Sequence, residues 1–580
     1  MRTKLLILSA GLLLLSACSS VKENPIKVNQ VGYYPSCEKT AVLEQEANTS
    51  KAVLLDAEGN TVWEGEAVRE AVSLWSGKVR KIIDFTEVSE PGEYTLKAGK
   101  FEQPVVIREA AFAPVAQAGM KAYYLQRTGC PIEEQYAGIY ARPAAHPDTC
   151  VMIHPSAASL SRPAGTIISS PFGWYDAGDF NKYVVNSGFT IGMLLLGYEA
   201  DKAYYDEWNL NIPESGDNTP DILDEIMYNL RWMATMQDPE DGSVYHKLTT
   251  PHFEGFIMPV DCQQQRYVVQ KSTTAALDLA ATFAQAYRIY KAYPEYQDFA
   301  EQMLRQAEKA YAWSVANPKV LYDQPGYNQT CEPEVSTGMY PDTETSDEFF
   351  WAATELYLAT GQQAYLEQAK QFMPAAFRLP VWGDIEWLGA YEWLQMSLVS
   401  NDLAAQQMKE ALAPMLVGYL DACLQTTAAS CFQMPYGNTP SDFCWGGNAE
   451  ICAGRGIAML YGWRLTGKPE YRAAALQHAD YILGRNATGY CFVTGFGTKQ
   501  VMHPHQRISF ADGIEAPLPG FLAGGPNPGQ QDKEAGVVYH TDYPGESYLD
   551  EQPSYATNEI AINWNAYLVH LMAGLDAAIR

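Results

Sequence analysis

The sequence predicts a mainly α protein, an (α/α)6 toroid preceded by a small immunoglobulin-like β-sandwich. The first reason is that residues 25–109 are rich in short β patterns separated by turn residues. The second is that apolar residues recur at helical spacing in twelve segments of residues 110–580. Twelve helices in hairpin pairs can close into an inner and an outer ring. A superhelical array of helical repeats is the competing architecture, but no repeat at fixed spacing supports it.

The β-sandwich prediction for residues 25–109 depends on seven short apolar runs. Turn-forming stretches such as "AEGN" and "SEPG" fall between several of them. Seven strands in so short a segment are typical of an immunoglobulin-type sandwich. The runs are "IKVNQV", "TAVLE", "KAVLLD", "TVWEGE", "VRKIIDF", "GEYTLK" and "QPVVI".

The helical prediction for residues 110–580 is clearest at Pro220. Thr219 can cap a helix, Pro220 suits its first turn, and apolar residues from Ile222 to Leu230 follow on one face. No strong strand region interrupts the series. The predicted helices are residues 113–129, 187–205, 220–237, 272–293, 299–317, 346–361, 364–377, 385–400, 402–425, 448–467, 469–484 and 556–579.

The N-terminus reads as an export signal. "MRTKLLILSAGLLLLSAC" has a basic start and an apolar run too short to cross a bilayer. It ends in a tetrad that resembles the bacterial lipobox, which predicts a signal in residues 1–18, lipidation of Cys18 and a tether in residues 19–24. An ordinary secretory signal that contains a cysteine is the alternative. We expect an exported monomeric lipoprotein, at the outer membrane, that meets the membrane only through its lipid and faces the periplasm or the cell surface.

Composition restricts the partners. The formal net charge of -28 repels nucleic-acid phosphates and anionic headgroups, so nucleic acid is not an expected partner. The chain has 37 Tyr, 20 Phe and 13 Trp, rings that could stack on sugars. Helix packing accounts for such numbers equally well.

Three loops rich in Gly, Pro and aromatic residues carry the candidate site. In "GWYDAGDFNKYVVN", Asp176 and Asp179 lie three apart, and like charges held close raise each other's pKa. The alternative is that both acids simply face water. His505 and Arg507, in "TGFGTKQVMHPHQRIS", have donors suited to sugar hydroxyls, or else cap a loop carbonyl and form a salt bridge. The third loop, "DYPGESYLDEQPSYATNE", ends at Glu559.

These loops resemble glycoside hydrolase family nine, the inverting cellulases. "GWYDAGDFNKYVVN", "RYVVQKSTTAALDLAA", "VTGFG" with "PHQR", and "SYATNEIAINWNA" carry the resemblance, and "IKVNQVGYYP" resembles the module that precedes one branch of the family. The likeness spans essentially the whole mature chain. Cys491 and Gln506 depart from the family pattern, and Gln506 could alter contacts to the sugar.

The resemblance implies a role for each acid. Asp179 is the expected general base, Asp176 helps to hold the attacking water, and Glu559 is the expected general acid. A helix start would lower the pKa of Glu559, and the charge of Asp550 is expected to offset this. Inversion needs the two carboxyl groups roughly 6.5–9.5 Å apart. Tyr555 and Trp351 match sugar-contacting positions, although Tyr555 could only support Glu559 and Trp351 could pack between helices.

Catalysis of this kind needs no cofactor, but structural metals are expected candidates. Cys130, His146, Cys150 and His154 predict a zinc site, near which relatives with the N-terminal module often bind zinc. Val151 stands where those relatives often have a histidine, and a Cys130–Cys150 disulfide is the alternative. Calcium is a second candidate, with no ligands assigned; the acids of "PESGDNTPDILDE" fit helix capping better.

The function that follows is an endo-acting β-1,4-glucanase acting on cellulose-like, mixed-linkage or xyloglucan chains. An exo-acting β-glucosaminidase on chitosan oligosaccharides is an alternative within the same fold. A non-catalytic glycan-binding lipoprotein is a third, but it would be expected to lack Asp179 or Glu559, and both are present.

Overall fold

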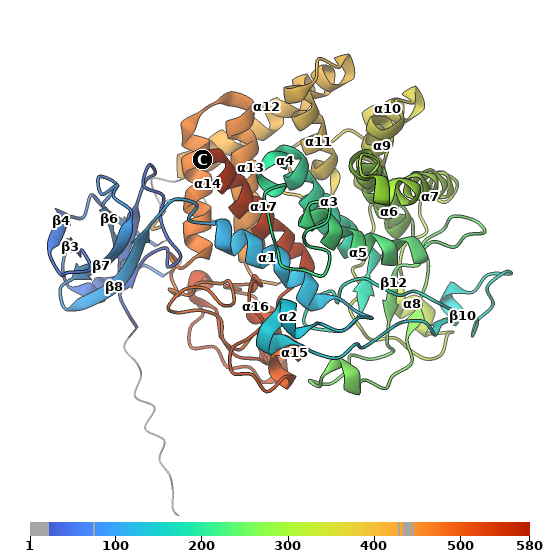
Figure 1. Cartoon of the computed structure of the whole chain (residues 1–580), viewed down its shortest axis with the longest axis horizontal. Coiled ribbons are helices and arrows are strands. Elements are labelled where there is room, and N and C mark those ends of the chain that lie inside the picture. The colour runs from blue at the N-terminus through green and yellow to red at the C-terminus, as the bar shows by residue number, and fades with distance from the viewer. Residues whose placement is uncertain (1–22, 74–75, 427–429, 433–441, 444–445) are drawn as a thin grey trace, which may run out of the picture.

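A computed structural model describes residues 23–73, 76–426, 430–432, 442–443 and 446–580. A small β domain lies beside a much larger helical body (Figure 1). Cys18 and the signal segment fall outside the described residues, as does most of the tether. Among the helices that are described, none has the length and apolar character needed to cross a membrane.

The β domain is a sandwich of two four-stranded antiparallel sheets. One sheet has the order β1 (Ile26–Lys27), β2 (Thr40–Leu43), β6 (Val79–Asp84), β5 (Arg69–Val72). The other has the order β4 (Thr61–Glu66), β3 (Lys51–Leu55), β7 (Gly92–Ala98), β8 (Phe101–Ile107). Leu54, Ile83 and Leu96 are buried between the sheets. Strand β5 was not predicted, because "REAV" lacks the β-branched and aromatic residues of a strong strand.

All twelve predicted helical segments contain a helix. Six helices are largely buried and form the inner ring: α3 (Val184–Ala200), α6 (Thr273–Tyr290), α9 (Ser346–Thr360), α11 (Glu386–Val399), α13 (Ala449–Thr466) and α17 (Ile562–Ile579). Their outer neighbours are α1 (Ala113–Gln126), α5 (Asp221–Thr235), α7 (Gln297–Ala316), α10 (Gln363–Gln371), α12 (Leu403–Thr426) and α14 (Pro469–Ile482). Inner helices face other helices on every side, which explains why they are apolar almost all round.

Short elements join these helices. Five strands of two or three residues form a small sheet in the order β10 (Ile167–Ile168), β9 (Val151–Ile153), β13 (Tyr267–Val268), β12 (Lys247–Thr249), β11 (Lys182–Tyr183). The sequence did not predict this sheet, because runs so short give no periodic signal. The remaining short helices are α2 (Glu134–Ala137), α4 (Lys202–Tyr205), α8 (Gln324–Asn328), α15 (Arg507–Ala511) and α16 (Tyr555–Asn558).

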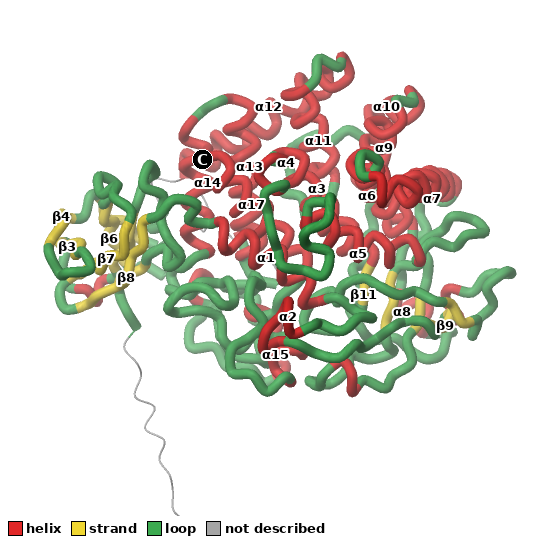
Figure 2. Tube along the Cα trace, viewed as in Figure 1, coloured by secondary structure: helices red, strands yellow, loops and turns green. Residues whose placement is uncertain are grey.

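Long loops gather at one end of the helical body. They lie below the helices in the view of Figure 2, on the side where the inner helices begin. Such loops can carry a site while the packed helices beneath them hold it rigid. The three candidate loops belong to this layer.

The β domain is joined to the helical body by polar contacts. The backbone N–H of Gln30 donates to the carbonyl of Leu483 at 2.9 Å, and Tyr34 donates to Asp576 of α17 at 2.5 Å. Arg80 and Lys78 both pair with Glu546, at 3.1 and 2.6 Å. Glu546 belongs to the loop that leads toward Glu559, so the small domain supports one of the candidate loops.

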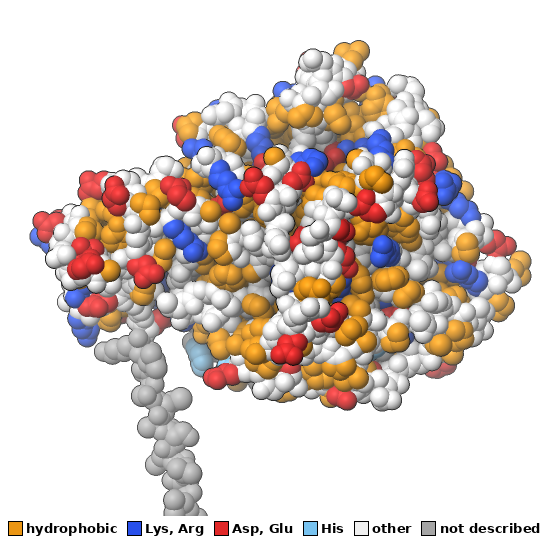
Figure 3. All heavy atoms as spheres, viewed as in Figure 1, with side chains coloured by type: hydrophobic (Ala, Val, Ile, Leu, Met, Phe, Trp, Pro, Cys, Tyr) orange, Lys and Arg blue, Asp and Glu red, His pale blue; other side chains and the backbone are white. Residues whose placement is uncertain are grey.

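Acidic and basic side chains are interspersed over the face shown in Figure 3. No broad basic field is visible on that face, and the net charge of the chain is -28. Nucleic acid binding needs clustered cations, so this face offers no electrostatic attraction for it.

Candidate active site

Backbone contacts join the three candidate loops into one unit. Ala177 forms an antiparallel bridge with Ala561, and His505 forms a parallel bridge with Glu559. The N–H of Arg507 donates to the carbonyl of Gly178 at 3.1 Å. Residues about 380 apart in sequence are thereby held by main-chain geometry, which is more rigid than contact through long side chains.

Gly178, between the two aspartates, is required for this close approach. A Cβ atom at Gly178 would lie 2.0 Å from the carbonyl oxygen of His505 and 3.2 Å from Oε1 of Glu559. The N–H of Gly178 donates to that same Oε1 at 3.3 Å. The D-A-G-D turn therefore passes directly beneath Glu559 because it has a glycine at its centre.

Asp179 is held through one carboxylate oxygen. Asn181 donates to Oδ2 at 2.5 Å, and the hydroxyl of Tyr183 donates to the same atom at 3.2 Å. Among the described residues no donor contacts Oδ1, so this oxygen is available to accept a proton from water. Tyr183 belongs to the short strand β11, which continues directly into inner helix α3.

Asp176 is buried and lies in the same turn. Asn186 donates to its Oδ1 at 2.8 Å and the Tyr340 hydroxyl to its Oδ2 at 2.7 Å. Burial, followed by the charge of Asp179, raises the pKa of Asp176 to about 8. The Asp176 carboxyl group therefore carries a proton at neutral pH.

Glu559 does not stand at a helix start. It lies in the extended link between α16, which ends at Asn558, and α17, which begins at Ile562. The expected pKa depression by a helix N-terminus is therefore wrong. Burial, followed by the charge of Asp179, raises the pKa of Glu559 to about 8, although Arg507 opposes the shift. Glu559 is thus a protonated acid at neutral pH, as a proton donor requires.

Asp550 does not act on Glu559 as predicted. Its carboxylate accepts hydrogen bonds from the backbone N–H groups of Met502 and His503, at 2.8 to 3.0 Å, and from Asn558 at 3.1 Å. The charges that raise the pKa of Glu559 are those of Asp179 and Asp176. Asp550 instead ties the His505 loop to the segment before Glu559, so it is a positioning residue.

His505 and Arg507 lie against the carboxylates, each fixed by backbone carbonyls. Nδ1 of His505 lies 2.7 Å from the carbonyl of Gln552, so Nδ1 carries the proton and Nε2 is an acceptor. Burial lowers the pKa of His505 to about 4, so its ring is neutral. Arg507 donates from Nε to the backbone carbonyl of Glu254 at 2.9 Å and from Nη1 to the backbone carbonyl of Gly178 at 2.8 Å. Its guanidinium therefore supports the D-A-G-D turn directly.

Tyr555 lies at the edge of this group. It begins α16 and is partly exposed, with its ring 6.0 Å from that of His505. Its place beside His505 fits either contact with a sugar or support of Glu559.

Trp351 is not a sugar-stacking residue. It is 0% exposed inside α9, and its ring lies against Gly192 of α3, where an added Cβ would approach it to 2.6 Å. A ring enclosed by two inner helices cannot reach a substrate. The prediction is wrong because the register of α9 turns this position into the core.

The predicted zinc ligands do not come together. His154 uses Nε2 on the carbonyl of Pro333 at 2.9 Å and Nδ1 on Ser156 at 2.8 Å, while His146 contacts Tyr175 at 2.7 Å. Cys130 and Cys150 are both free thiols, which also excludes the alternative disulfide. Within the described part of the chain, these four residues form no group with metal-binding geometry.

A different cluster has the chemistry of a cation site. Side-chain oxygens of Asp342, Asp347 and Glu348 lie within 4.8 Å of one another, and Asp384 and Glu386 form a second such group with Asp347. Oxygens without hydrogen-bond partners among the described residues are Asp342 Oδ2, Asp347 Oδ1, Glu386 Oε2 and both of Glu348. Burial raises the pKa of Asp342 to about 6, and burial with the charge of Asp347 raises that of Glu348. An oxygen-only set of this kind suits a hard cation such as calcium.

Sequence reasoning missed several residues of the site. Tyr340 has φ 48°, and its hydroxyl reaches Asp176 from the loop before α9. Lys247 of β12 is buried and donates to Gln324 and Thr337, both at 2.8 Å; burial lowers its pKa to about 7. The positive φ of Tyr340 and the burial of Lys247 are visible only in three dimensions. No sequence pattern could therefore have placed these two residues in the site.

Comparison with known proteins agrees with this geometry. A family model described as "Glycosyl hydrolase family 9" matches residues 112–572, and "Cellulase N-terminal ig-like domain" matches residues 21–103. A xyloglucan-specific endo-beta-1,4-glucanase of Bacteroides ovatus is 50% identical over 561 residues, 96% of this chain and 95% of that protein. Endoglucanase D of Acetivibrio thermocellus is 32% identical over 95% of this chain and 83% of its own. A solved structure, "Bacteroides ovatus GH9", has a TM-score of 0.92 at 49% identity, over 96% of this chain and 99% of that one.

A toroid of helices with an aspartate pair facing a protonated glutamate defines a glycoside hydrolase. The chain belongs to glycosyl hydrolase family 9, which confirms both the resemblance and the predicted fold class. The N-terminal β domain is the immunoglobulin-like module of the cellulases.

Proposed function

We propose that this protein is an endo-β-1,4-glucanase that hydrolyses β-glucan chains with inversion. The carrying observation is that the buried Glu559 accepts a hydrogen bond from Gly178, in the turn that presents Asp179, and this burial raises the pKa of Glu559 to about 8. Inverting hydrolysis needs one protonated and one ionised carboxyl group on opposite sides of the scissile bond. The 50% identity to an endo-beta-1,4-glucanase over nearly the whole chain supports the same activity.

The proposed reaction divides the work among the loops. Glu559 gives its proton to the leaving glycosidic oxygen, so the sugar departs as an alcohol. Asp179 takes a proton from water through Oδ1, and the water attacks the anomeric carbon from the opposite face. Asp176 helps to hold that water. Arg507 and Asp550 keep the loops in place, and Nε2 of His505 accepts a hydrogen bond from a sugar hydroxyl.

Xyloglucan is the proposed preferred substrate, because the relative at 50% identity is named for it. The test is release of reducing ends from xyloglucan, mixed-linkage β-glucan, carboxymethylcellulose and chitosan oligosaccharides by the purified protein, with product sizes followed over time. A rapid fall in chain length on xyloglucan supports the proposal. Release of single glucosamine units from chitosan alone would support the exo-acting alternative, and no hydrolysis of any substrate would support a glycan-binding protein.

We also propose that the Asp342 cluster binds calcium as a structural ion. Tyr340, which donates to Asp176, lies two residues before Asp342. A cation there would neutralise the buried carboxylates and fix the loop that carries Tyr340. Because the acids repel one another without it, calcium should stabilise the folded state.

Removal of calcium should lower the melting temperature by several degrees and reduce activity at the same time. Calorimetry in EGTA and after return of calcium measures this. Asp347→Asn should abolish the calcium response, whereas Asp402→Asn, at an exposed position before α12, should retain it. An unchanged melting temperature in EGTA for a protein that contains no calcium by elemental analysis would refute the site.

We propose that Cys18 is lipidated and anchors the protein to the outer membrane. The lipobox-like end of the apolar run supports this. A single acyl chain binds a membrane only marginally, so stable anchoring needs several chains on this cysteine. Cys18→Ala should move the protein into the soluble fraction on cell fractionation. Retention of the variant with membranes would contradict the anchor.

A further inference from the structure

Lys247 is a buried lysine on the strand next to the one that follows the D-A-G-D turn. It belongs to β12, is 0% exposed, and pairs in antiparallel register with Tyr183 of β11. Its Nζ lies 5.4 Å from the centre of the Tyr183 ring, and the hydroxyl of Tyr183 donates to Asp179 at 3.2 Å. The small sheet thus brings this side chain close to the expected catalytic base.

The ammonium group of Lys247 is held by three neutral acceptors. Its Nζ donates to Oε1 of Gln324 at 2.8 Å, to Oγ1 of Thr337 at 2.8 Å and to the carbonyl of Gly338 at 2.6 Å. Three acceptors around one nitrogen match the three N–H groups of a protonated lysine. Among the described residues, no carboxylate forms an ion pair with Lys247, so none cancels its charge at short range.

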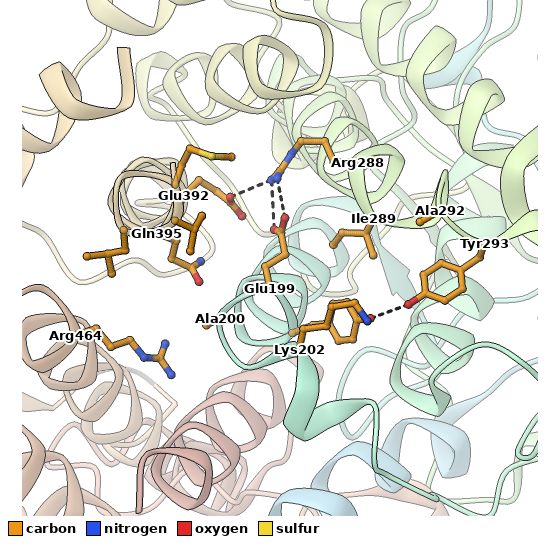
Figure 4. Close-up of a pocket in the computed structure, with 14 residues that line it drawn as sticks. Glu199, Ala200, Lys202, Arg288, Ile289, Ala292, Tyr293, Glu392, Gln395 and Arg464 are labelled. Carbon is orange, nitrogen blue, oxygen red and sulfur yellow. Dashed lines mark hydrogen bonds and ion pairs between the residues drawn. The ribbon is translucent and has the colours of Figure 1, made fainter. Parts of the chain in front are cut away.

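Two other largely buried cations show the usual arrangement. Arg288 pairs with Glu199 at 2.7 Å and with Glu392 at 2.9 Å, and Figure 4 shows its guanidinium directed at both carboxylates. Lys182 of β11 pairs with Asp148 at 2.7 Å. Burial of a charge is costly unless a partner compensates it. The lack of a carboxylate beside Lys247 therefore calls for a compensating charge at longer range.

A chain of hydrogen bonds leads from this ammonium group to Asp179. Oγ1 of Thr337 lies 2.6 Å from Oγ1 of Thr249, and Thr249 donates to Oδ1 of Asn181 at 3.1 Å. Asn181 in turn donates to Oδ2 of Asp179 at 2.5 Å. Each of these side chains is buried, so little water screens the charge of Lys247 from that of Asp179.

Lys247 and Asp179 interact through their charges. Burial lowers the pKa of Lys247 to about 7, and the charge of Asp179 opposes this shift. Lys247 is therefore charged throughout the acidic range of pH. Because the attraction between two charges is mutual, the ammonium group favours the ionised form of Asp179 in the same measure.

The titratable neighbours of Lys247 do not offset its charge. The rings of Tyr183 and Tyr322 lie 5.4 and 5.8 Å from its Nζ, and His246 precedes it in the chain. Burial raises the pKa values of both tyrosines and lowers the pKa of His246 to about 3, so all three side chains are neutral.

The titratable groups that face Asp179 do not titrate in the acidic range. Burial, followed by the charge of Asp179, raises the pKa values of Asp176 and Glu559 to about 8, and burial also raises the pKa of Tyr340. Arg507 is a further cation at the site, and its effect is to lower the pKa of Glu559. An acid limb in the pH profile therefore reports on the base itself.

We propose that Lys247 is a positioning residue for the general base, whose buried ammonium group keeps Asp179 in the ionised form through the field along this network. The inference rests on the proposed inverting hydrolysis, in which Asp179 takes a proton from water. Lys247 acts without touching the reacting atoms. A protonated Asp179 cannot serve as a base, so the lysine extends activity toward lower pH.

Lys247→Met should move the acid limb of the kcat/KM profile on xyloglucan to higher pH by about one unit, which is roughly a tenfold loss below the limb. Methionine has a similar length and no charge. The difference from the native enzyme should shrink as the pH rises above the limb, because Asp179 then ionises without help. A merely structural role would instead lower kcat/KM by the same factor at every pH.

Gln324→Glu is a second variant that keeps the lysine. Gln324 is 6% exposed, and a carboxylate of the same size there would pair with the ammonium group and offset its charge. It should move the acid limb in the same direction, and it tests the inference even if Lys247→Met does not fold. Lys182→Met is the matched control, because this buried lysine of the same sheet is already neutralised by Asp148. Its acid limb should stay in place.

The outcomes separate the role of Lys247 from the activity itself. An acid limb at the native position in Gln324→Glu and in folded Lys247→Met would overturn the role of Lys247 while the hydrolase assignment stands. An equal shift in Lys182→Met would overturn it as well, since the effect would then not be specific to the unpaired lysine. If the native protein hydrolyses no glucan at any pH, the proposed function fails and this inference fails with it.

Discussion

Glu559→Gln should lower kcat/KM on xyloglucan by at least about a hundredfold, the lower range for loss of a general acid. Glutamine occupies the same space and can still accept from the N–H of Gly178, but it cannot give a proton to the leaving oxygen. Aryl glycosides with good leaving groups should partly restore the rate, because their departure needs no proton. Glu551→Gln, at an exposed position in the same loop, is the matched control and should change nothing.

The pH profile should identify the same group. The pKa of Glu559 is raised to about 8, so the acid form that catalysis needs is lost as the pH rises through that value. The rate should therefore fall on the alkaline side near pH 8 in the native enzyme. Glu559→Gln should lose this alkaline limb, while any acid limb persists. An alkaline limb of the same position in the variant would assign it to another group.

Asp179→Asn separates the base from the acid. The activity of this variant should also fall by at least about a hundredfold. A good leaving group should not restore the activity, because the attacking water still lacks its base. Asp176→Asn should cost less, since Asp176 only helps to hold the water. Proton NMR of the first product should show the α-anomer. An initial β-anomer would mean retention and would contradict the roles of both acids.

The sequence predicted the parts of this site that lie in short, continuous signatures. Asp176 and Asp179 share one turn, and Glu559 lies in a segment whose residue types and spacing match the family, so their meeting could be inferred before any coordinates. The twelve helices were also predictable, because each shows several turns of apolar periodicity. These features depend on local chain chemistry that the sequence displays directly.

The remaining features depend on tertiary placement. Trp351 has the residue type of a sugar platform, but the rotation of α9 turns it toward α3 and into the core. Asp550 has the charge to act on Glu559, yet its oxygens are occupied by backbone N–H groups of the His505 loop. Tyr340 reaches Asp176 across 164 residues. No pattern of spacing specifies where a side chain points once a loop has closed.

Gly178→Ala should lower activity about as severely as loss of a catalytic carboxylate, although it removes no reacting group. The added Cβ would lie 2.0 Å from the carbonyl oxygen of His505, a distance that forces one backbone segment to move. The His505 segment is restrained by two backbone hydrogen bonds. The N–H of His505 donates to the carbonyl of Asn558 at 2.8 Å, and the N–H of Arg507 donates to the carbonyl of Gly178. Any shift that relieves the clash therefore separates Asp179 from Glu559.

The change should also destabilise the protein by about 1–3 kcal/mol, the usual cost of overpacking. Gly418→Ala is the control: in α12 its Cβ meets no atom within 4 Å, and alanine should stabilise the helix by about 0.5–1 kcal/mol with full activity. Thermal melts and kcat/KM of the two variants measure both effects. If Gly178→Ala folds with native stability and native kcat/KM, then close backbone contact between the turn and the His505 loop does not set the position of the acids. Loss of activity with a largely retained melting temperature would show the reverse, since a displacement of about 1 Å is enough to misalign an acid and a base while the barrel beneath them stays folded.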